Sequence, residues 1–273
     1  MTLGEVLGLA SEHLAKTSET ARLDAELLLA HALGRSRIEL YTDFDRPLDE
    51  SEVAAYRALV ARRARHEPVA YILGEWGFRR LTLHVDRRAL IPRPETEIVV
   101  ERCLERLRGL VEPTVLDVGT GTGAIALALA DEHEGARVTA IDLSAEALEL
   151  ARENAERSGL EVQLLEHDLR DGLPDGPYDL VVSNPPYVEP ADLNGLMSDV
   201  RDYEPQLALV GVGATEAIAR AARDVLRPGG WLVLEVGDGQ ASQTLALLGT
   251  LGYGDGTSTP DLAGRERVVE GRR

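Results

Sequence analysis

The chain has 273 residues, of which 44% are hydrophobic, and it carries a formal net charge of -18. This composition is typical of a globular protein with a substantial core and argues against a disordered chain. No apolar run approaches the ~20 residues needed to cross a bilayer, and the N-terminus lacks the basic segment of a signal peptide. We therefore expect no membrane contact, and the single cysteine, Cys103, favours the reducing cytoplasm.

The negative charge is concentrated in the second part of the chain. Residues 1–90 contain 13 Lys and Arg against 14 Asp and Glu, so nearly all of the acidic excess lies in residues 91–273. Such an acidic region repels a phosphate backbone, which lowers the expectation of a nucleic-acid substrate. Eight arginines fall between Arg57 and Arg88. They have two possible interpretations, a solvated face or a docking patch for an acidic or RNA-rich partner.

The first 65 residues follow a helical pattern. Residues 20–34 (TARLDAELLLAHALG) place Leu23, Leu27 and Leu28 near a 3.6-residue period, and Gly34 ends the pattern. Residues 50–68 predict a second amphipathic helix, which ends before its proline. Residues 75–86 (EWGFRRLTLHVD) alternate as a β-hairpin does. We therefore expect three parts: a helical bundle over 1–70, a hairpin linker over 71–90, and a third domain over 91–273.

From Thr114 onward the pattern changes to alternating strands and helices. Apolar runs predict strands at 114–119, 137–142, 162–168, 178–183, 231–237 and, at the tail, 265–271. Helical stretches separate most of them, and the one over 215–230 precedes the strand that starts at Trp231. This alternation predicts an α/β domain with a mostly parallel sheet that helices cover on both faces.

A glycine-rich loop follows the first strand and opens the first helix. It reads DVGTGTGA over residues 117–124. Glycines let backbone amides approach a ligand without interference from Cβ atoms. The residues that we expect to bind a cofactor here are Gly119, Thr120, Gly121, Thr122 and Gly123. The loop alone is ambiguous, because it also fits the dinucleotide-binding pattern G-x-G-x-x-G/A.

Two carboxylates follow the next two strands. Asp142 ends the second strand and can accept both hydroxyls of a ribose, since Ser144 is better placed to cap the following helix. Asp168 ends the third strand and can accept the amine of an adenine, with Leu169 covering the ring; a plain surface turn is the alternative. Ligand groups at the carboxyl ends of consecutive strands describe an adenosine site.

The stretch SNPPY follows the fourth strand and distinguishes the reaction. Two prolines remove two backbone donors and fix two φ angles, so they form a rigid turn. The Asn184 side-chain oxygen and the Pro185 carbonyl can each accept one N–H of a planar nitrogen and hold its lone pair toward a methyl donor. Pro186 and Tyr187 would complete the slot, with Tyr187 as its wall. A dehydrogenase has no use for this arrangement, whereas a methyltransferase acting on an amine-like nitrogen does.

At this point the sequence resembles S-adenosylmethionine-dependent amino-methyltransferases. The stretches that carry the resemblance are DVGTGTGAIALALA, AIDLSAEALELARENA and SNPPYV. Residues 68–78 (PVAYILGEWGF) and 90–101 (LIPRPETEIVVE) narrow it, because they are similar to the peptide chain release factor N5-glutamine methyltransferases. The tail over 261–271 is also similar, and the likeness is weakest over residues 1–65.

The resemblance implies the fold, the reaction and the roles of individual residues. It implies a Rossmann-like methyltransferase domain with a mostly parallel seven-stranded sheet and a small N-terminal helical domain that docks the release factor. The methyl acceptor would be the glutamine amide of the GGQ tripeptide of class 1 release factors, with S-adenosylmethionine as cofactor and no metal. Arg93 and Thr96 resemble the loop that closes over the methyl-transfer centre and count among the cofactor-binding residues. A monomer is expected.

One departure and two other functional interpretations accompany this hypothesis. After residues 204–209 (EPQLAL) the family reads Gly-Gly and then Asp-Gly, whereas this chain has VGVGAT over 210–215. The resemblance places that loop near the substrate side. A nucleic-acid base amino-methyltransferase is the enzymatic alternative, because the NPPY motif is shared with such enzymes. A non-catalytic scaffold is the third possibility, although the chain keeps both Asn184 and the glycine loop.

Overall fold

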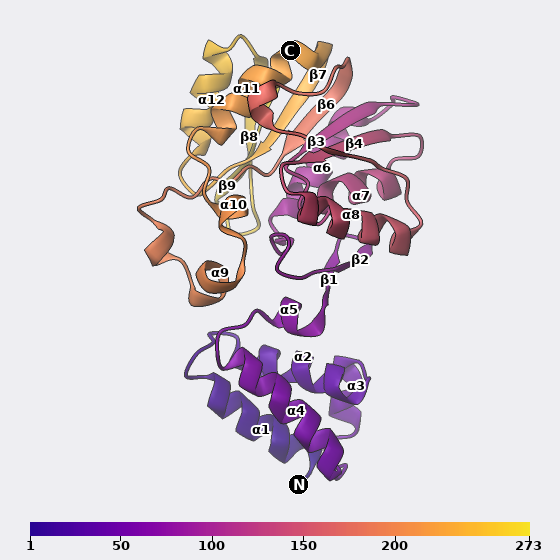
Figure 1. The fold of residues 1–273 in the computed structure, drawn as a ribbon, viewed down its shortest axis with the longest axis vertical. Helices are drawn as coiled ribbons and strands as arrows, with labels where there is room; N and C mark the ends of the chain where they lie inside the picture. The colour runs from indigo at the N-terminus through magenta and orange to yellow at the C-terminus, as the bar shows by residue number, and fades with distance from the viewer. The chain divides into compact units, whose positions relative to one another are not determined.

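Five helices make up the first 75 residues in the computed structural model, which describes all 273 residues (Figure 1). They are α1 (Leu3–Leu14), α2 (Ala21–Leu33), α3 (Arg37–Thr42), α4 (Glu50–Arg63) and α5 (Val69–Leu73). A much later segment, α9 (Ser198–Tyr203), joins them, and residues 1–75 with 196–203 form one compact unit. We call it the helical unit. The Tyr203 hydroxyl donates to the Arg65 carbonyl (2.8 Å), which attaches the later segment.

The helix of residues 20–34 forms as predicted, but its buried face differs from the expected one. Gly34 ends it with φ 61°, a left-handed conformation that glycine adopts at little cost. Leu28 is buried, whereas Leu23 is 39% exposed. The reason is that Asp24 occupies the interior instead, where it accepts a hydrogen bond from Arg63 Nε (2.7 Å). Hydrophobic periodicity does not anticipate a buried ion pair between two helices.

The remaining residues, 76–195 and 204–273, form a second compact unit built on a seven-stranded sheet. We call it the sheet unit. The strand order is β5-β4-β3-β6-β7-β9-β8, and β9 alone runs opposite to the other six strands. The predicted mostly parallel seven-stranded sheet is thereby confirmed. The strands are β3 (Thr114–Val118), β4 (Arg137–Asp142), β5 (Gln163–Glu166), β6 (Tyr178–Ser183), β7 (Leu226–Glu235), β8 (Gly254–Pro260) and β9 (Glu266–Arg272).

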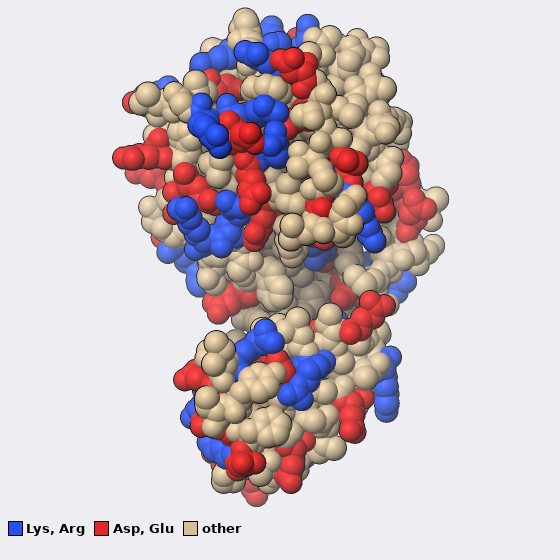
Figure 2. Space-filling model, turned by 180° about the vertical axis from the view of Figure 1, so that it is seen from behind, with Lys and Arg blue, Asp and Glu red and all other residues tan.

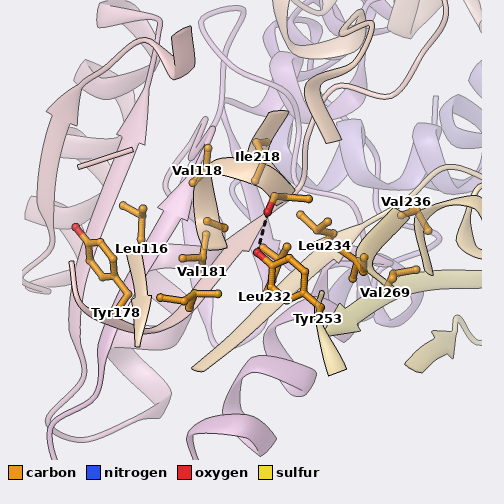
Figure 3. Close-up of a cluster of buried hydrophobic side chains, with 14 of the residues drawn as sticks. Leu116, Val118, Tyr178, Val181, Ile218, Leu232, Leu234, Val236, Tyr253 and Val269 are labelled. Carbon is orange, nitrogen blue, oxygen red and sulfur yellow. Dashed lines mark hydrogen bonds between the residues drawn. The ribbon is translucent and has the colours of Figure 1, made fainter. Parts of the chain in front are cut away.

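Helices cover both faces of this sheet, as expected from its apolar strands. Strand alternation directs Leu116 and Val118 of β3 into a core beneath α11 and α12, and Figure 3 shows this cluster. There the Tyr253 hydroxyl donates to the Ala219 carbonyl (2.8 Å). Asp117, between them on β3, faces the opposite way. The helices of the sheet unit are α6 (Thr96–Leu107), α7 (Ala124–Glu132), α8 (Ala145–Ser158), α10 (Gln206–Leu209), α11 (Ala214–Val225) and α12 (Ala241–Thr250).

Two elements differ from the sequence-based expectation. Residues 226–230 (LRPGG) belong to β7 and not to the preceding helix, which ends at Val225. Strand β8 was not predicted, because its residues (GDGTSTP) lack the apolar alternation of a half-buried strand and pair only at the sheet edge. The predicted hairpin is present as β1 (Glu75–Phe78) and β2 (Leu81–His84). None of the helices is both long and apolar enough to traverse a bilayer.

Candidate active site

A pocket of about 270 Å³ opens at the carboxyl ends of β3, β4 and β6 in the sheet unit. Neighbours of β3 in the sheet are β4 on one side and β6 on the other, so the strand order reverses there. Such a switch point is where open α/β sheets bind their ligands. Twelve of the predicted site residues line the pocket: Arg93, Thr96, Gly119, Thr120, Gly121, Thr122, Asp142, Asp168, Leu169, Asn184, Pro185 and Pro186. Gly123 and Tyr187 do not.

The glycine loop connects β3 to α7 in a conformation that demands its glycines. Gly123 caps α7 with φ 83°, and a Cβ built there would lie 3.1 Å from Leu127 Cδ1 and 3.3 Å from Ala151 Cβ. Gly123 therefore allows α7 and α8 to pack closely, and it does not line the pocket. Asn154, buried on α8, holds the loop from behind by donating to the Thr122 carbonyl (2.9 Å). Its sequence context, a helix interior, gave no signal of this role.

Asp142 is oriented by two backbone amides. Its Oδ2 accepts from Gly121 N and its Oδ1 from Ser144 N, both at 2.9 Å. Since each carboxylate oxygen has a second lone pair, both can still accept from a ligand in the pocket. Ser144 caps α8 by accepting from Ala147 N (3.2 Å), as predicted, so Asp142 is not needed as the cap.

Asp168 lines the pocket but is also engaged by a neighbouring arginine. It lies two residues beyond β5 and caps a 3-10 turn, where Oδ1 accepts from Arg170 N (2.9 Å). The Arg170 side chain adds further hydrogen bonds, and together they lower the pKa of Asp168 to about 2. The carboxylate is thus charged, but Arg170 donates to both of its oxygens, in the turn that was the alternative interpretation. Its contact with an adenine amine stays a prediction.

The Asn184 side chain is held by a chain of hydrogen bonds. Its Nδ2 donates to Thr96 Oγ1 (3.3 Å), and Thr96 Oγ1 donates to Glu235 Oε2 (2.6 Å). Because the Thr96 proton is committed to the carboxylate, only the NH₂ end of the amide complements Thr96. Asn184 Oδ1 makes no hydrogen bond within the chain and is not fully buried, so it is free to accept from a ligand.

The other members of the NPPY turn have distinct surroundings. Pro185 is buried, and Pro186 and Tyr187 are half-buried. The Tyr187 ring lies beside Gly237, where an added Cβ would be 3.1 Å from Tyr187 Cδ2. Its backbone carbonyl accepts from Gln240 Nε2 (3.3 Å). Tyr187 as a wall of the substrate slot remains a prediction.

Glu204 binds the loop before α6, and the sequence analysis did not predict this role. Glu204 is buried, accepts from Ile91 N (3.2 Å), and forms an ion pair with Arg93. Arg93 therefore lines the pocket with its guanidinium already engaged. The altered loop of residues 210–215 lies beside the NPPY turn, because Val188 N donates to the Leu209 carbonyl (3.0 Å) next to it.

Asp117 was not predicted as a site residue, although a carboxylate within the apolar strand VLDVG is an available signal. It is fully buried, and burial raises its pKa to about 7 against the hydrogen bond from Thr120 Oγ1 (2.6 Å). Its other oxygen, Oδ1, has no hydrogen-bond partner. Asp117 does not line the pocket itself and contacts the glycine loop through the Thr120 hydroxyl.

This arrangement fits S-adenosylmethionine. Asp142 can accept from a ribose diol, Asp168 borders the same pocket, and the apolar side chains of Ile125, Ile141 and Leu169 line it. No group of His, Cys, Asp and Glu side chains is arranged to hold a metal ion.

Several of the arginines between Arg57 and Arg88 form ion pairs with acidic side chains of the same protein. Four of them form ion pairs at 2.7 Å: Arg62 with Glu67, Arg63 with Asp24, Arg79 with Glu132, and Arg88 with Glu153. On the face drawn in Figure 2, basic and acidic side chains are interspersed over both units. These observations favour a solvated, ion-paired surface over a docking patch.

Comparisons with known proteins identify the family. The family model "PrmC N-terminal domain" matches residues 5–74, and "Methyltransferase small domain" matches residues 96–199. The release factor glutamine methyltransferase of Geobacter sulfurreducens is 45% identical over 99% of this chain and 96% of its own length. That of Chlorobaculum tepidum is 47% identical over 86% of this chain and 85% of its own.

A solved structure supports the fold. The Thermus thermophilus 16S rRNA N2 G1207 methyltransferase, in complex with AdoMet and guanosine, superposes with a TM-score of 0.54 and 21% identity, covering 73% of this chain and 49% of that one. At this identity the likeness concerns the methyltransferase fold alone. The sequence relatives, by contrast, match this chain over nearly its whole length. The chain belongs to the release factor glutamine methyltransferase family.

Proposed function

We propose that this protein methylates the side-chain amide nitrogen of the glutamine in the GGQ motif of class 1 peptide chain release factors. The family membership supports this substrate, and one observation of the site carries the chemistry. Asn184 Oδ1 is free at the pocket while its Nδ2 is fixed by Thr96. The site thus presents an oriented acceptor, which a carboxamide N–H complements.

The residues of the NPPY turn prepare the glutamine nitrogen for attack. An amide nitrogen is a poor nucleophile, because its lone pair is delocalised into the carbonyl. Asn184 Oδ1 and the Pro185 carbonyl accept its two N–H groups, which fixes the direction of the lone pair. Positioning of this kind is worth at most roughly 7–11 kcal/mol of the barrier. Both acceptors also stabilise the positive charge that develops on nitrogen.

S-adenosylmethionine, when bound, supplies an electrophilic methyl group. Asp142 holds the ribose hydroxyls, and Asp168 with Leu169 holds the adenine. The glycine loop, Gly119 to Gly123, accommodates the rest of the cofactor. No side-chain base is required, because a nitrogen that has gained a methyl group loses its proton readily to water. We place the reaction in the cytoplasm, where translation occurs, with a monomeric enzyme and without a nucleic-acid substrate.

Mass spectrometry of a release factor tests the proposal. Incubation with this protein and S-adenosylmethionine is expected to add one methyl group at the GGQ glutamine. A release factor with that glutamine replaced by asparagine is the matched control and should stay unmodified. Methyl incorporation into ribosomal RNA or DNA, with none in the release factor, would instead establish the base amino-methyltransferase. Absence of transfer to any of them would support the non-catalytic scaffold.

A further inference from the structure

Glu235 is a buried carboxylate that the proposed chemistry does not use. It ends β7 within the apolar run LVLEV and is 1% exposed. A charged side chain in such a place is costly unless it is paired or hydrogen-bonded. The hydrogen bond that it receives from Thr96 is short, at 2.6 Å, a length typical of a hydroxyl donating to an ionised carboxylate.

The ionisation of Glu235 sets the direction of the whole hydrogen-bond chain. When Glu235 is ionised it can only accept, so Thr96 donates to it and offers a lone pair to Asn184. The Asn184 NH₂ group then turns to Thr96, and its oxygen is left for the pocket. When Glu235 is protonated it can donate to Thr96, and Thr96 can donate to Asn184 Oδ1. That reversal removes the acceptor from the pocket.

We propose that Glu235 is a positioning residue that sets, through Thr96, which end of the Asn184 side-chain amide faces the pocket. The consequence for catalysis rests on the proposed function, because an amide turned the other way would present a donor to the glutamine N–H. The hydrogen-bond switch itself involves only residues of this protein, so it is measurable without any substrate.

The surroundings of Glu235 determine the pH at which it titrates. Burial raises its pKa to about 7, and the hydrogen bond from Thr96 opposes this effect. The charged and titratable groups that face it are Arg93 and Glu95 before α6, Tyr187 after β6, and Arg267 on β9. The two arginines favour the ionised form, and Glu95 disfavours it. The switch is therefore expected to operate near neutral pH.

Nuclear magnetic resonance tests the switch independently of activity. With asparagine selectively labelled in ¹⁵N, the side-chain NH₂ signals of Asn184 are identified by their loss in Asn184→Asp. In the wild-type protein these signals should move with a single titration near pH 7. In Glu235→Gln, which cannot ionise, they should not move in that range. Asn184 signals that are unchanged from about pH 6 to 8.5, or that titrate equally in Glu235→Gln, would overturn the proposal.

Kinetics test the consequence. At saturating substrates the wild-type kcat should fall as the pH drops below about 7, and the kcat of Glu235→Gln should be independent of pH there. Thr96→Val breaks the chain and should lower kcat on the order of 10- to 100-fold, with a smaller change in KM. Thr96→Ser keeps the hydroxyl and should recover most of that loss. Combining Thr96→Val with Glu235→Gln should cost no more than Thr96→Val alone.

The outcomes separate the two hypotheses. Wild-type protein that methylates no release factor contradicts the proposed function, and the Asn184 signals still decide the switch. If the wild-type protein is active and the kcat of Glu235→Gln still falls at low pH as the wild-type kcat does, the switch alone is contradicted. If Glu235→Gln fails to fold, Thr96→Val against Thr96→Ser carries the test, and equal rates in these two variants would refute the role of the chain.

Discussion

Gly211 lies directly against Pro186 of the NPPY turn. A Cβ built on Gly211 would be 2.4 Å from Pro186 Cγ and 2.6 Å from the Pro186 carbonyl oxygen, so any side chain there displaces the turn. The loop of residues 210–215, which departs from the family pattern, thus supports the site through a backbone contact. Gly211 does not have a positive φ, so the reason for a glycine there is the lack of room for a Cβ beside Pro186.

Gly211→Ala is expected to move Pro186 and with it the acceptors of the site. Displacement of this size lowers turnover on the order of 10- to 100-fold and destabilises the fold by about 1–3 kcal/mol. Steady-state kinetics and thermal unfolding measure the two effects. Gly195→Ala is the matched control, since its Cβ would meet nothing within 4 Å. Equal turnover of the two variants would show that the contact does not position the turn.

Asn184→Ala removes the oriented acceptor. We expect a loss of roughly 10²-fold or more in kcat, the effect of deleting one group that stabilises developing charge. Cofactor affinity, measured by calorimetry, should fall much less. Asn194→Ala, which truncates an exposed asparagine nearby in the sequence, should leave the rate unchanged. A fully active Asn184→Ala protein would refute the assigned role.

Asp142→Asn tests the ribose site. The substitution removes the charge and turns an NH₂ group toward either Gly121 N or Ser144 N, both of which are donors. Loss of a hydrogen bond to a charged group corresponds to about 10- to 100-fold weaker binding. Isothermal titration calorimetry with S-adenosylmethionine measures the change. Asp131→Asn, at the exposed end of α7, should bind as the wild type does. Unaltered affinity in Asp142→Asn would remove the residue from the cofactor site.

Asp117 and Glu235 predict how stability depends on pH. Both carboxyls have a pKa near 7 in the folded protein, raised by burial from ordinary values of 3.8 and 4.5. A group that binds its proton more tightly when folded stabilises the fold fully below its unfolded pKa. That contribution is lost as the pH rises through 7. The free energy of unfolding without cofactor should therefore decrease between about pH 5 and 8, by up to ~1.4 kcal/mol per pH unit for each group.

Urea denaturation of Asp117→Asn measures the share of one group. The variant should show a shallower decrease over the same pH range, whereas Asp131→Asn should follow the wild type. Carboxylates whose pKa is lowered, such as Asp168, act at lower pH and do not contribute to this window. A wild-type stability that rises from pH 5 to 8 would contradict the raised pKa values.

The sequence predicted those parts of the site whose signals are local in the chain. The glycine loop, Asp142 and the NPPY turn each follow an apolar strand directly, and parallel strands bring their carboxyl ends to one edge. The same locality explains why the strand-helix alternation gave the fold class. Strand β8 lacked an apolar pattern, and residues 226–230 carry Pro and Gly inside a strand, so both were missed.

The residues by themselves determined the fold class, the glycine loop after β3 and the rigid turn after β6, because backbone periodicity and turn chemistry act over a few neighbours. Only the tertiary structure decided how the acceptor is oriented. Thr96 lies 88 residues from Asn184 and 139 from Glu235 in sequence, yet the three share one hydrogen-bond chain. Burial is the main cause of the raised pKa of Glu235, and burial depends on how α6 packs against β6 and β7.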